Sequence, residues 1–185
     1  MTTGHAERSC AGCTLCCRLL AVDSLAKPAL VTCVHCTADG TAESGCRIYA
    51  RRPQDCRDYL CGYLRIADVP DHWEPRRSGM VIQISDDPAK IIVHADPDRP
   101  ELWRIDPYYS DLKAWAALAL EHEARVYVVV RAATTIILPD RHVDLGVLGE
   151  GDSIDLVSIP GPEGIRRFVY AKKTGEPAKG PRFWR

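Results

Sequence analysis

The sequence predicts an α+β fold, in which a cysteine-rich module of short helices and loops precedes a small antiparallel-sheet domain with one packed helix. Three observations lead to this prediction. All nine cysteines of the 185-residue chain lie within its first 61 residues. Residues after 69 contain seven segments rich in Val, Ile, Thr and Tyr, separated by Gly, Pro or Asp. One further segment has the apolar spacing of a helix. We therefore expect a cysteine module at residues 1–68, a β-rich α+β domain at 69–173 and a loose tail at 174–185.

Two short helices are expected in the cysteine module. One is predicted at residues 13–20. The other is predicted at residues 53–62, because its first residue is Pro53, whose fixed φ suits the start of a helix. Cys56 would then lie inside this helix, and Cys61 at its C-terminal end. The remaining sequence is polar and glycine-containing and cannot pack a core unaided, so a bound metal is expected to supply the missing stability.

The second domain is expected to be a sheet with one helix against it. The predicted strands are residues 79–85, 90–95, 125–131, 134–138, 142–148, 153–159 and 165–171. Their short, turn-separated pattern favours an antiparallel sheet. The helix is predicted at residues 110–124, with Ser110 as N-cap and Asp111 in the first turn, where the helix dipole favours an anion. Its apolar stripe, which is expected to cover one sheet face, consists of Leu112, Trp115, Ala116 and Ala119.

The cysteine spacing predicts a metal site. Cys10-x-x-Cys13 and Cys33-x-x-Cys36 each place two thiolates so that both can bind one cation, as in zinc knuckles and ribbons. Together these two pairs would complete one tetrahedral site. Crowded thiolates repel one another unless a cation neutralises them. The other thiols suffice for a second site, with one bridging or unbound, and they are Cys16, Cys17, Cys46, Cys56 and Cys61.

Zinc and iron both remain open as the metal. Cys10-x-x-Cys13-x-x-Cys16 matches the first three ligands of a bacterial [4Fe–4S] ferredoxin cluster. The fourth ligand of such a cluster precedes proline, and this chain has no Cys-Pro, so another remote thiol would have to complete it. Cys16 and Cys17 are adjacent and project in different directions. We therefore expect them to serve different metals, or one of them to bind none directly.

The cysteine motifs resemble those of the CxxCxxCC family of zinc- or iron-chelating domains, the YkgJ-type cysteine cluster proteins. The matching segments are residues 10–18, 33–36 and 46–59, the last of which reads Cys-Arg-Ile-Tyr-Ala-Arg-Arg-Pro-Gln-Asp-Cys-Arg-Asp-Tyr. The resemblance implies a metal-chelating cysteine cluster. A relative, the flagellin lysine methylase, carries such a cluster in a longer chain, but nothing here matches a methyl-donor site. Residues 69–185 lie outside the resemblance.

Other polar clusters have less specific interpretations. His5 and His35 could each replace a thiolate, but nine cysteines make this unnecessary. Asp140-x-His142-x-Asp144 would share one face of a strand, either as an oxygen and nitrogen site or, as we expect, as a solvated face. Arginines near the sulfurs are expected to offset thiolate charge or to hydrogen-bond across the module, and they are Arg47, Arg51, Arg52 and Arg57.

The favoured hypothesis is a cytoplasmic metal-binding protein, with a structural zinc or iron and a C-terminal domain that binds a protein partner. The alternative is an iron–sulfur redox or modification enzyme. The sequence contains no phosphate-binding glycine loop, nucleophile elbow or HExxH motif, so no catalytic residues are assigned. A net charge of −1 argues against nucleic acid as a partner. The absence of an apolar targeting or spanning segment predicts a cytoplasmic location without membrane contact, where thiols stay reduced.

Overall fold

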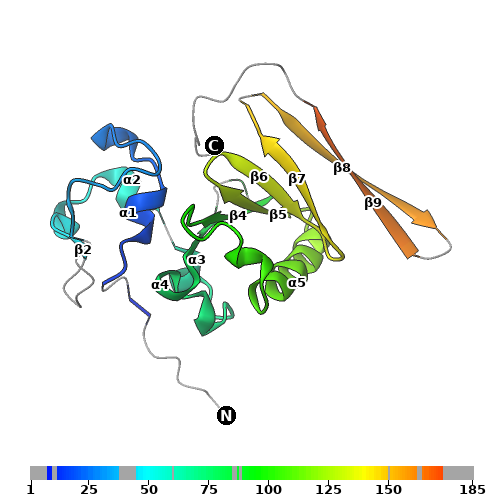
Figure 1. Ribbon diagram of the computed structural model, residues 1–185, viewed down its shortest axis with the longest axis horizontal. Helices are drawn as coiled ribbons and strands as arrows, with labels where there is room; N and C mark the ends of the chain where they lie inside the picture. The colour runs from blue at the N-terminus through cyan, green and yellow to red at the C-terminus, as the bar shows by residue number, and fades with distance from the viewer. Residues whose placement is uncertain are drawn as a thin grey trace, which may run out of the picture.

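A five-stranded sheet forms the centre of the protein, with the cysteine module on one side and a long hairpin on the other (Figure 1). The computed structural model describes residues 8–9, 12–37, 45–59, 61–84, 87, 89–149, 151–161 and 164–172. Cys10 and the predicted tail at 174–185 lie outside these residues. Both helices and sheets are present, which confirms the α+β class.

The seven predicted strands are confirmed, each within two residues at either end. The central sheet comprises β3 (Met80–Ile84), β4 (Lys90–Ala95), β5 (Arg125–Val130), β6 (Ala133–Ile137) and β7 (His142–Val147), in that order. The hairpin comprises β8 (Ser153–Gly161) and β9 (Gly164–Lys172), which pair only with each other among the described strands. β-branched side chains dominate β3 to β6, as a packed, pleated surface requires.

The expectation of a purely antiparallel sheet is wrong. β4 and β5 run parallel, with Lys90 opposite Arg125 and Ala95 opposite Val130. The other neighbouring strands of the sheet are antiparallel. The reason is the helix α5 (Tyr108–Glu121), which returns the chain across the sheet so that β5 starts at the same end as β4.

The predicted helix of the second domain is α5, but it begins two residues earlier than expected. Its N-cap is Pro107 and not Ser110. Asp106 lies just before it, and its Oδ1 accepts hydrogen bonds from the Ser110 amide (3.2 Å) and hydroxyl (2.7 Å). The predicted apolar stripe is confirmed, because Leu112, Ala116 and Ala119 are buried and Trp115 packs against the same core.

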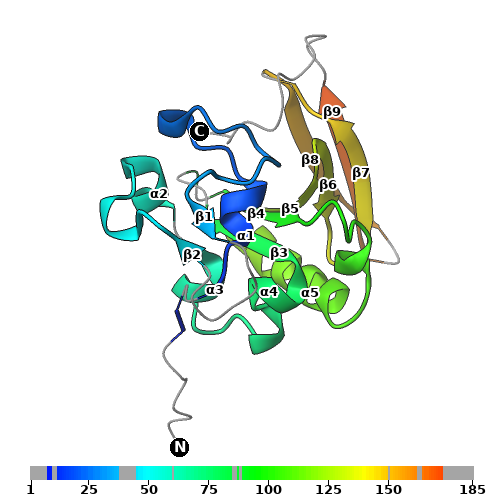
Figure 2. The same cartoon turned by 60° about the vertical axis from the view of Figure 1, so that its left-hand side comes forward.

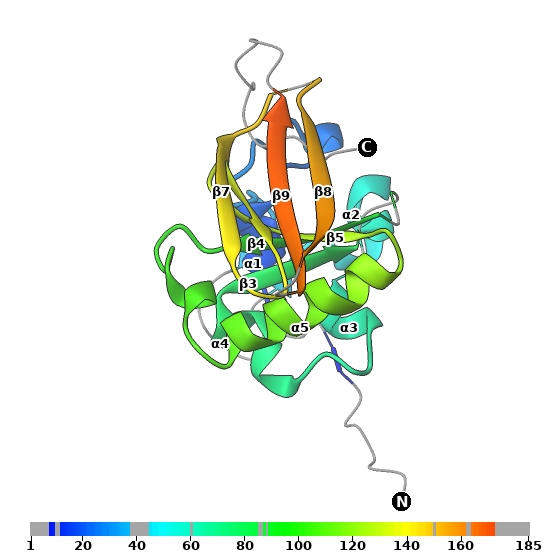
Figure 3. The ribbon, with the colours of Figure 1, turned by 90° about the vertical axis from the view of Figure 1, so that its right-hand side faces the viewer.

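The two faces of the sheet are covered differently. On one face, α5 packs with Trp73 and Trp103 over Val93 and Val128, and these four side chains are at most 1% exposed. On the opposite face, two separate elements make the cover. Val81 of β3 packs against Leu19 and Leu20 of the cysteine module. Residues of β5 to β7 pack against the hairpin (Figure 3), namely Tyr127, Ile136 and Leu145 against Ile154, Leu156 and Val169.

The cysteine module consists of short elements. They are α1 (Leu15–Leu19), η1 (Asp23–Leu25), β1 (Cys36–Thr37), β2 (Gly45–Cys46), η2 (Tyr49–Arg51), α2 (Gln54–Asp58) and α3 (Gly62–Arg65). Three more short helices, η3 (Asp71–Trp73), α4 (Pro75–Ser78) and η4 (Leu102–Arg104), belong to the sheet domain. The helix predicted at 13–20 is confirmed as the shorter α1. The helix predicted at 53–62 is wrong in extent, because Tyr59 has an extended backbone and ends α2. Cys61 therefore lies not at a helix end but just before α3.

The module is attached to the sheet domain by two arginines and a short bridge. Arg18 pairs with Asp96 and, at 2.9 Å, with Asp98 in the loop after β4. Arg8 donates to the carbonyl oxygens of residues 63 and 69 at 2.8 and 2.6 Å and pairs with Asp71. The backbone of Cys61 bridges to Gln83 at the end of β3. Contacts thus cross the predicted division at residue 68, and the division into two domains stays a prediction.

Candidate metal centre

Eight of the nine cysteines are described, and all eight are thiols. They are Cys13, Cys16, Cys17, Cys33, Cys36, Cys46, Cys56 and Cys61. Two lie in α1, two face each other across the β1–β2 pair, one lies in α2 and one precedes α3. Figure 2 shows these elements folded together beside the edge of the central sheet. The fold therefore gathers thiols that are far apart in sequence.

Backbone hydrogen bonds place the Cys33-x-x-Cys36 pair directly beside α1. The Cys33 amide donates to the carbonyl of Cys17 (3.0 Å), and the Cys36 amide donates to the carbonyl of Cys33 (2.9 Å). The second bond closes a tight turn between the two residues of this pair, whose thiols interact electrostatically. Cys46 joins them because it is the direct β-partner of Cys36.

The thiol of Cys17 contacts two other thiols. It accepts hydrogen bonds from Cys16, its neighbour in α1, and from Cys36 in β1. The bond from Cys16 is the main reason why the pKa of Cys17 falls from 9.0 to about 6, and the charge of Lys27 adds to it. Burial acts in the opposite direction but is outweighed. Cys17 is therefore a thiolate at neutral pH.

Three of the surrounding thiols have a raised pKa. Burial raises the pKa of Cys36 and of Cys56, and the negative charge of Cys17 raises both further. Burial also raises the pKa of Cys61. A group of thiols that cannot all ionise together has the electrostatic character of a cation site, because a bound cation removes this mutual repulsion.

Lys27 is a buried cation among these thiols. It is 7% exposed, and its Nζ donates to the carbonyl oxygens of Leu20 and Pro28. Burial lowers its pKa, while the charges of Cys33 and Cys17 act against this shift. A buried ammonium group requires anionic neighbours, so Lys27 is a counter-charge for the thiolates. The sequence analysis missed this residue, because a single lysine in a loop carries no spacing signal.

A second group of thiols surrounds Tyr59. Burial raises the pKa of this tyrosine well above its usual value, and the charges of Cys61, Cys16 and Cys13 raise it further. Its hydroxyl is buried and has no hydrogen-bond partner of good geometry within the described residues. Cys16 also packs against the Leu19–Leu20–Val81 cluster, whereas Cys17 contacts Cys36. Because Cys16 also interacts with Cys17, the expectation that the two adjacent thiols serve different metals stays a prediction.

The described residues contain no set of three or more His, Cys, Asp or Glu side chains already arranged to hold a metal ion. Cys10, which belongs to the first predicted pair, lies outside the described part of the chain, as does His5. The assignment of all nine cysteines as ligands stays a prediction. The same holds for the division of the ligands between one or two sites.

The arginines of the module act as expected where their contacts are described. The Arg52 guanidinium lies 3.7 Å from the ring centre of Tyr49, and its Nε donates to the Tyr49 carbonyl (3.1 Å). Nε of Arg57 donates to the Arg52 carbonyl (2.8 Å). The charge of Arg52 also helps to lower the pKa of Cys17. These side chains hold the segment around Cys56 together and offset thiolate charge.

The Asp140-x-His142-x-Asp144 motif does not converge on one site. Asp140 pairs with its neighbour Arg141 at 2.6 Å. Nδ1 of His142 is hydrogen-bonded to the Tyr109 hydroxyl at 2.9 Å. The Asp144 side chain is 62% exposed, as expected for a solvated strand position. Each of the three side chains thus has its own surroundings.

Comparison with known proteins adds no relative. No protein-family model, no curated protein and no solved structure matches the chain. The interpretation of the cysteine module therefore depends on its own residues and their contacts.

Proposed function

We propose that this protein binds zinc or iron through its cysteine module, at one or two sites, and that the metal keeps the module folded. The observation that carries the proposal is the contact of Cys17 with both Cys16 and Cys36. Cys36 comes from a distant part of the sequence, and the pKa of Cys17 is lowered to about 6 by these contacts. A thiolate at neutral pH, surrounded by further thiols, is the form of cysteine that binds metal.

The small core of the module supports a structural role for the metal. Among its described residues, only Leu19 and Leu20 are buried large apolar side chains. Ordering a backbone costs about 1–2 kcal/mol per residue, and fully burying one such side chain contributes only about 1.5–3 kcal/mol. Structural zinc sites contribute on the order of 10 kcal/mol of apparent binding free energy. A bound metal would therefore add stabilisation that two buried leucine side chains cannot supply.

Two neighbouring groups of thiols are the proposed ligand sets. One consists of Cys17, Cys33, Cys36, Cys46 and Cys56, which interact with one another and with Lys27. The other consists of Cys13, Cys16 and Cys61 around Tyr59, with Cys10 as the fourth thiol of the motif. Resemblance of these motifs to the CxxCxxCC chelating domains supports the same assignment.

We propose that the C-terminal domain binds a protein partner. Large apolar side chains are exposed on one face of the hairpin, where Val157 and Ile159 of β8 are 42% and 50% exposed. Grouped exposed apolar side chains are a feature of interaction surfaces. The proposed location is the cytoplasm, whose reducing environment keeps thiols available for metal. Among the described helices, none has the length and apolar character needed to cross a membrane.

Cobalt(II) titration of chelator-treated protein tests the proposal. We expect strong thiolate-to-cobalt charge-transfer absorption that saturates, because each coordinated thiolate contributes to it. Cys33→Ser should reduce this absorption, whereas the exposed neighbour Thr32, changed to Ser as a matched control, should not. If the titrated protein shows no charge-transfer band, the proposal is wrong.

The alternative function, an iron–sulfur redox or modification enzyme, makes a different prediction. Protein purified without oxygen would then be brown, and dithionite would bleach its visible absorption. Colourless protein that contains only zinc would exclude this alternative. The same sample therefore distinguishes a redox role for the cluster from a zinc-based structural role.

A further inference from the structure

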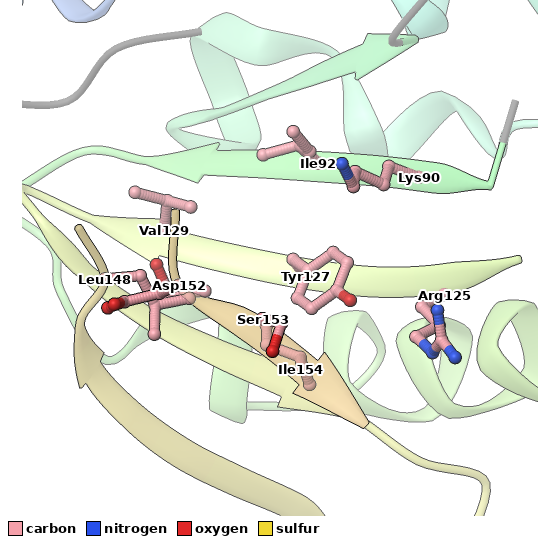
Figure 4. A pocket seen from close by; sticks show the side chains of 10 residues that line it. Lys90, Ile92, Arg125, Tyr127, Val129, Leu148, Asp152, Ser153 and Ile154 are labelled. Atoms are coloured by element: carbon pink, nitrogen blue, oxygen red, sulfur yellow. The ribbon is translucent and has the colours of Figure 1, made fainter. Parts of the chain in front are cut away.

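A small cavity lies on the sheet face opposite α5, between this face and the start of the hairpin (Figure 4). Its volume is about 170 Å³. The floor is formed by Ile92 of β4 with Tyr127 and Val129 of β5, all of which are buried. Leu148 and Ile154, on the segment between the sheet and the hairpin, close it from the other side. The cavity is therefore apolar over most of its wall.

One end of this cavity carries two cations. Lys90 and Arg125 are opposite each other in the parallel β4–β5 pair, so their side chains emerge side by side on the same face. Like charges in this position destabilise a sheet unless anions compensate them. Lys90 is compensated by Asp87, whose carboxylate lies 2.8 Å from its Nζ.

Only some of the hydrogen-bond donors of Arg125 have a partner within the described residues. Its guanidinium is hydrogen-bonded to the side chain of Tyr127. Its Nε is buried and has no hydrogen-bond partner among the described residues. Arg125 also lines the cavity, so the rest of its guanidinium can donate to an anionic ligand at this end.

The opposite end of the cavity limits the charge of a ligand. Asp152 lies there, beside Leu148 and away from Arg125 (Figure 4). Its Oδ2 accepts a hydrogen bond from the Gly149 amide at 2.7 Å, which fixes the carboxylate in the turn. A second anionic group at this end would be repelled. The cavity therefore fits a molecule with one negative charge at the Arg125 end.

The volume limits the size of the ligand as well. An apolar cavity of about 150 Å³ holds one benzene molecule, whereas sites for drug-sized ligands measure about 300–1,000 Å³. At about 170 Å³, this cavity accommodates one six-membered ring or an aliphatic chain of similar volume.

We propose that this cavity is a binding site for a small monocarboxylate with an apolar body. The carboxylate accepts hydrogen bonds from Arg125, and the apolar body lies over Ile92, Tyr127 and Val129. This site is independent of the metal proposed for the cysteine module, because none of these residues is a cysteine or contacts one in the described structure.

The test uses the purified full-length protein and benzoate as the probe, followed by amide chemical shifts in a ¹H–¹⁵N NMR titration. We expect saturable shifts at the lining residues of β4 and β5. Benzamide, the neutral isostere, should bind about tenfold more weakly or worse, since charge-assisted hydrogen bonds are roughly twice as strong as neutral ones. Terephthalate adds a second carboxylate facing Asp152, and the repulsion between these two anions should weaken its binding to a similar degree. Arg125→Gln should weaken benzoate binding to a similar degree. Arg76→Gln, an exposed arginine on α4, is the control and should leave it unchanged.

The comparison of ligands on the unchanged protein keeps the proposal testable even if Arg125→Gln fails to fold. Equal binding of benzoate and benzamide would overturn the assignment of a carboxylate site. Shifts that do not saturate, or that map away from β4 and β5, would overturn the site itself. If Arg125→Gln folds, as its amide spectrum would show, and still binds benzoate with unchanged affinity, the role of Arg125 is wrong.

Discussion

Replacing Gly62 by alanine tests how the cysteine module is attached to the sheet. Gly62 is the first residue of α3 and directly follows Cys61. A Cβ at this position would lie 2.6 Å from Cγ2 and 2.8 Å from Cβ of Ile82. Ile82 lies in β3, is 2% exposed and belongs to the main core. Real Cβ atoms do not approach other atoms this closely, so either α3 or β3 must move.

The expected cost follows from this geometry. A rotamer change cannot relieve the contact with Ile82 Cβ, and a β-branched side chain has little freedom at χ1 in any case. Adding a methyl group to a well-packed core costs about 1–3 kcal/mol, and this site belongs in the upper half of that range. The gain from replacing glycine in a helix is at most about 1 kcal/mol. We therefore predict that Gly62→Ala lowers the free energy of unfolding by about 1–2 kcal/mol.

Urea denaturation followed by tryptophan fluorescence measures this change, since Trp73 and Trp103 are buried in the core that Ile82 joins. Gly45→Ala is the matched control. Gly45 also neighbours a cysteine, but a Cβ there would meet no atom within 4 Å. Its substitution should change the free energy of unfolding by less than about 0.5 kcal/mol. If the two variants are equally stable, α3 does not pack on β3 as described.

Three further predictions concern the module. In chelator-treated protein, the iodoacetamide reaction of Cys17, followed by mass spectrometry, should rise only towards the ordinary cysteine pKa of 9.0, because the contacts that lower this pKa to about 6 are lost when the module unfolds; a rate that falls only below about pH 6 would show that the module stays folded without metal. Arg18→Gln should destabilise the protein by about 1 kcal/mol in thermal unfolding at low salt, with a smaller effect at high salt, since its ion pairs to the loop after β4 are partly exposed. Cys33→Ser should remove amide-exchange protection from residues 12–59 but retain it in β4 to β6, and unchanged protection of the module would show that it folds without this thiol.

The strands and α5 could be predicted because their signals are local. β-branched runs between turn residues gave the strands within two residues, and the stripe of Leu112, Ala116 and Ala119 gave the buried face of α5. The parallel pairing of β4 with β5 could not be read in this way, because it depends on the path of the chain through α5. For this reason the juxtaposition of Lys90 with Arg125, and the cavity beside them, had no sequence signal.

The cysteine module shows the same limit. The spacing of the cysteines identified the candidate ligands, but not which thiols contact one another. That Cys36 lies against Cys17 depends on the turn from Cys33 and on its hydrogen bond to α1. The burial of Lys27 likewise depends on the loop between α1 and Cys33, which no periodicity describes. Contacts between segments that are distant in sequence, rather than secondary structure, are what the sequence left undetermined.

The most direct test of the proposed function is elemental analysis of untagged, full-length protein purified without oxygen, together with an assay for acid-labile sulfide. The thiolate character of Cys17 and the thiols gathered around it predict one or two equivalents of zinc, or iron with matching sulfide, per chain. Protein that contains neither metal, is folded throughout residues 12–59 and has nine thiols that all react with a thiol reagent would contradict the account.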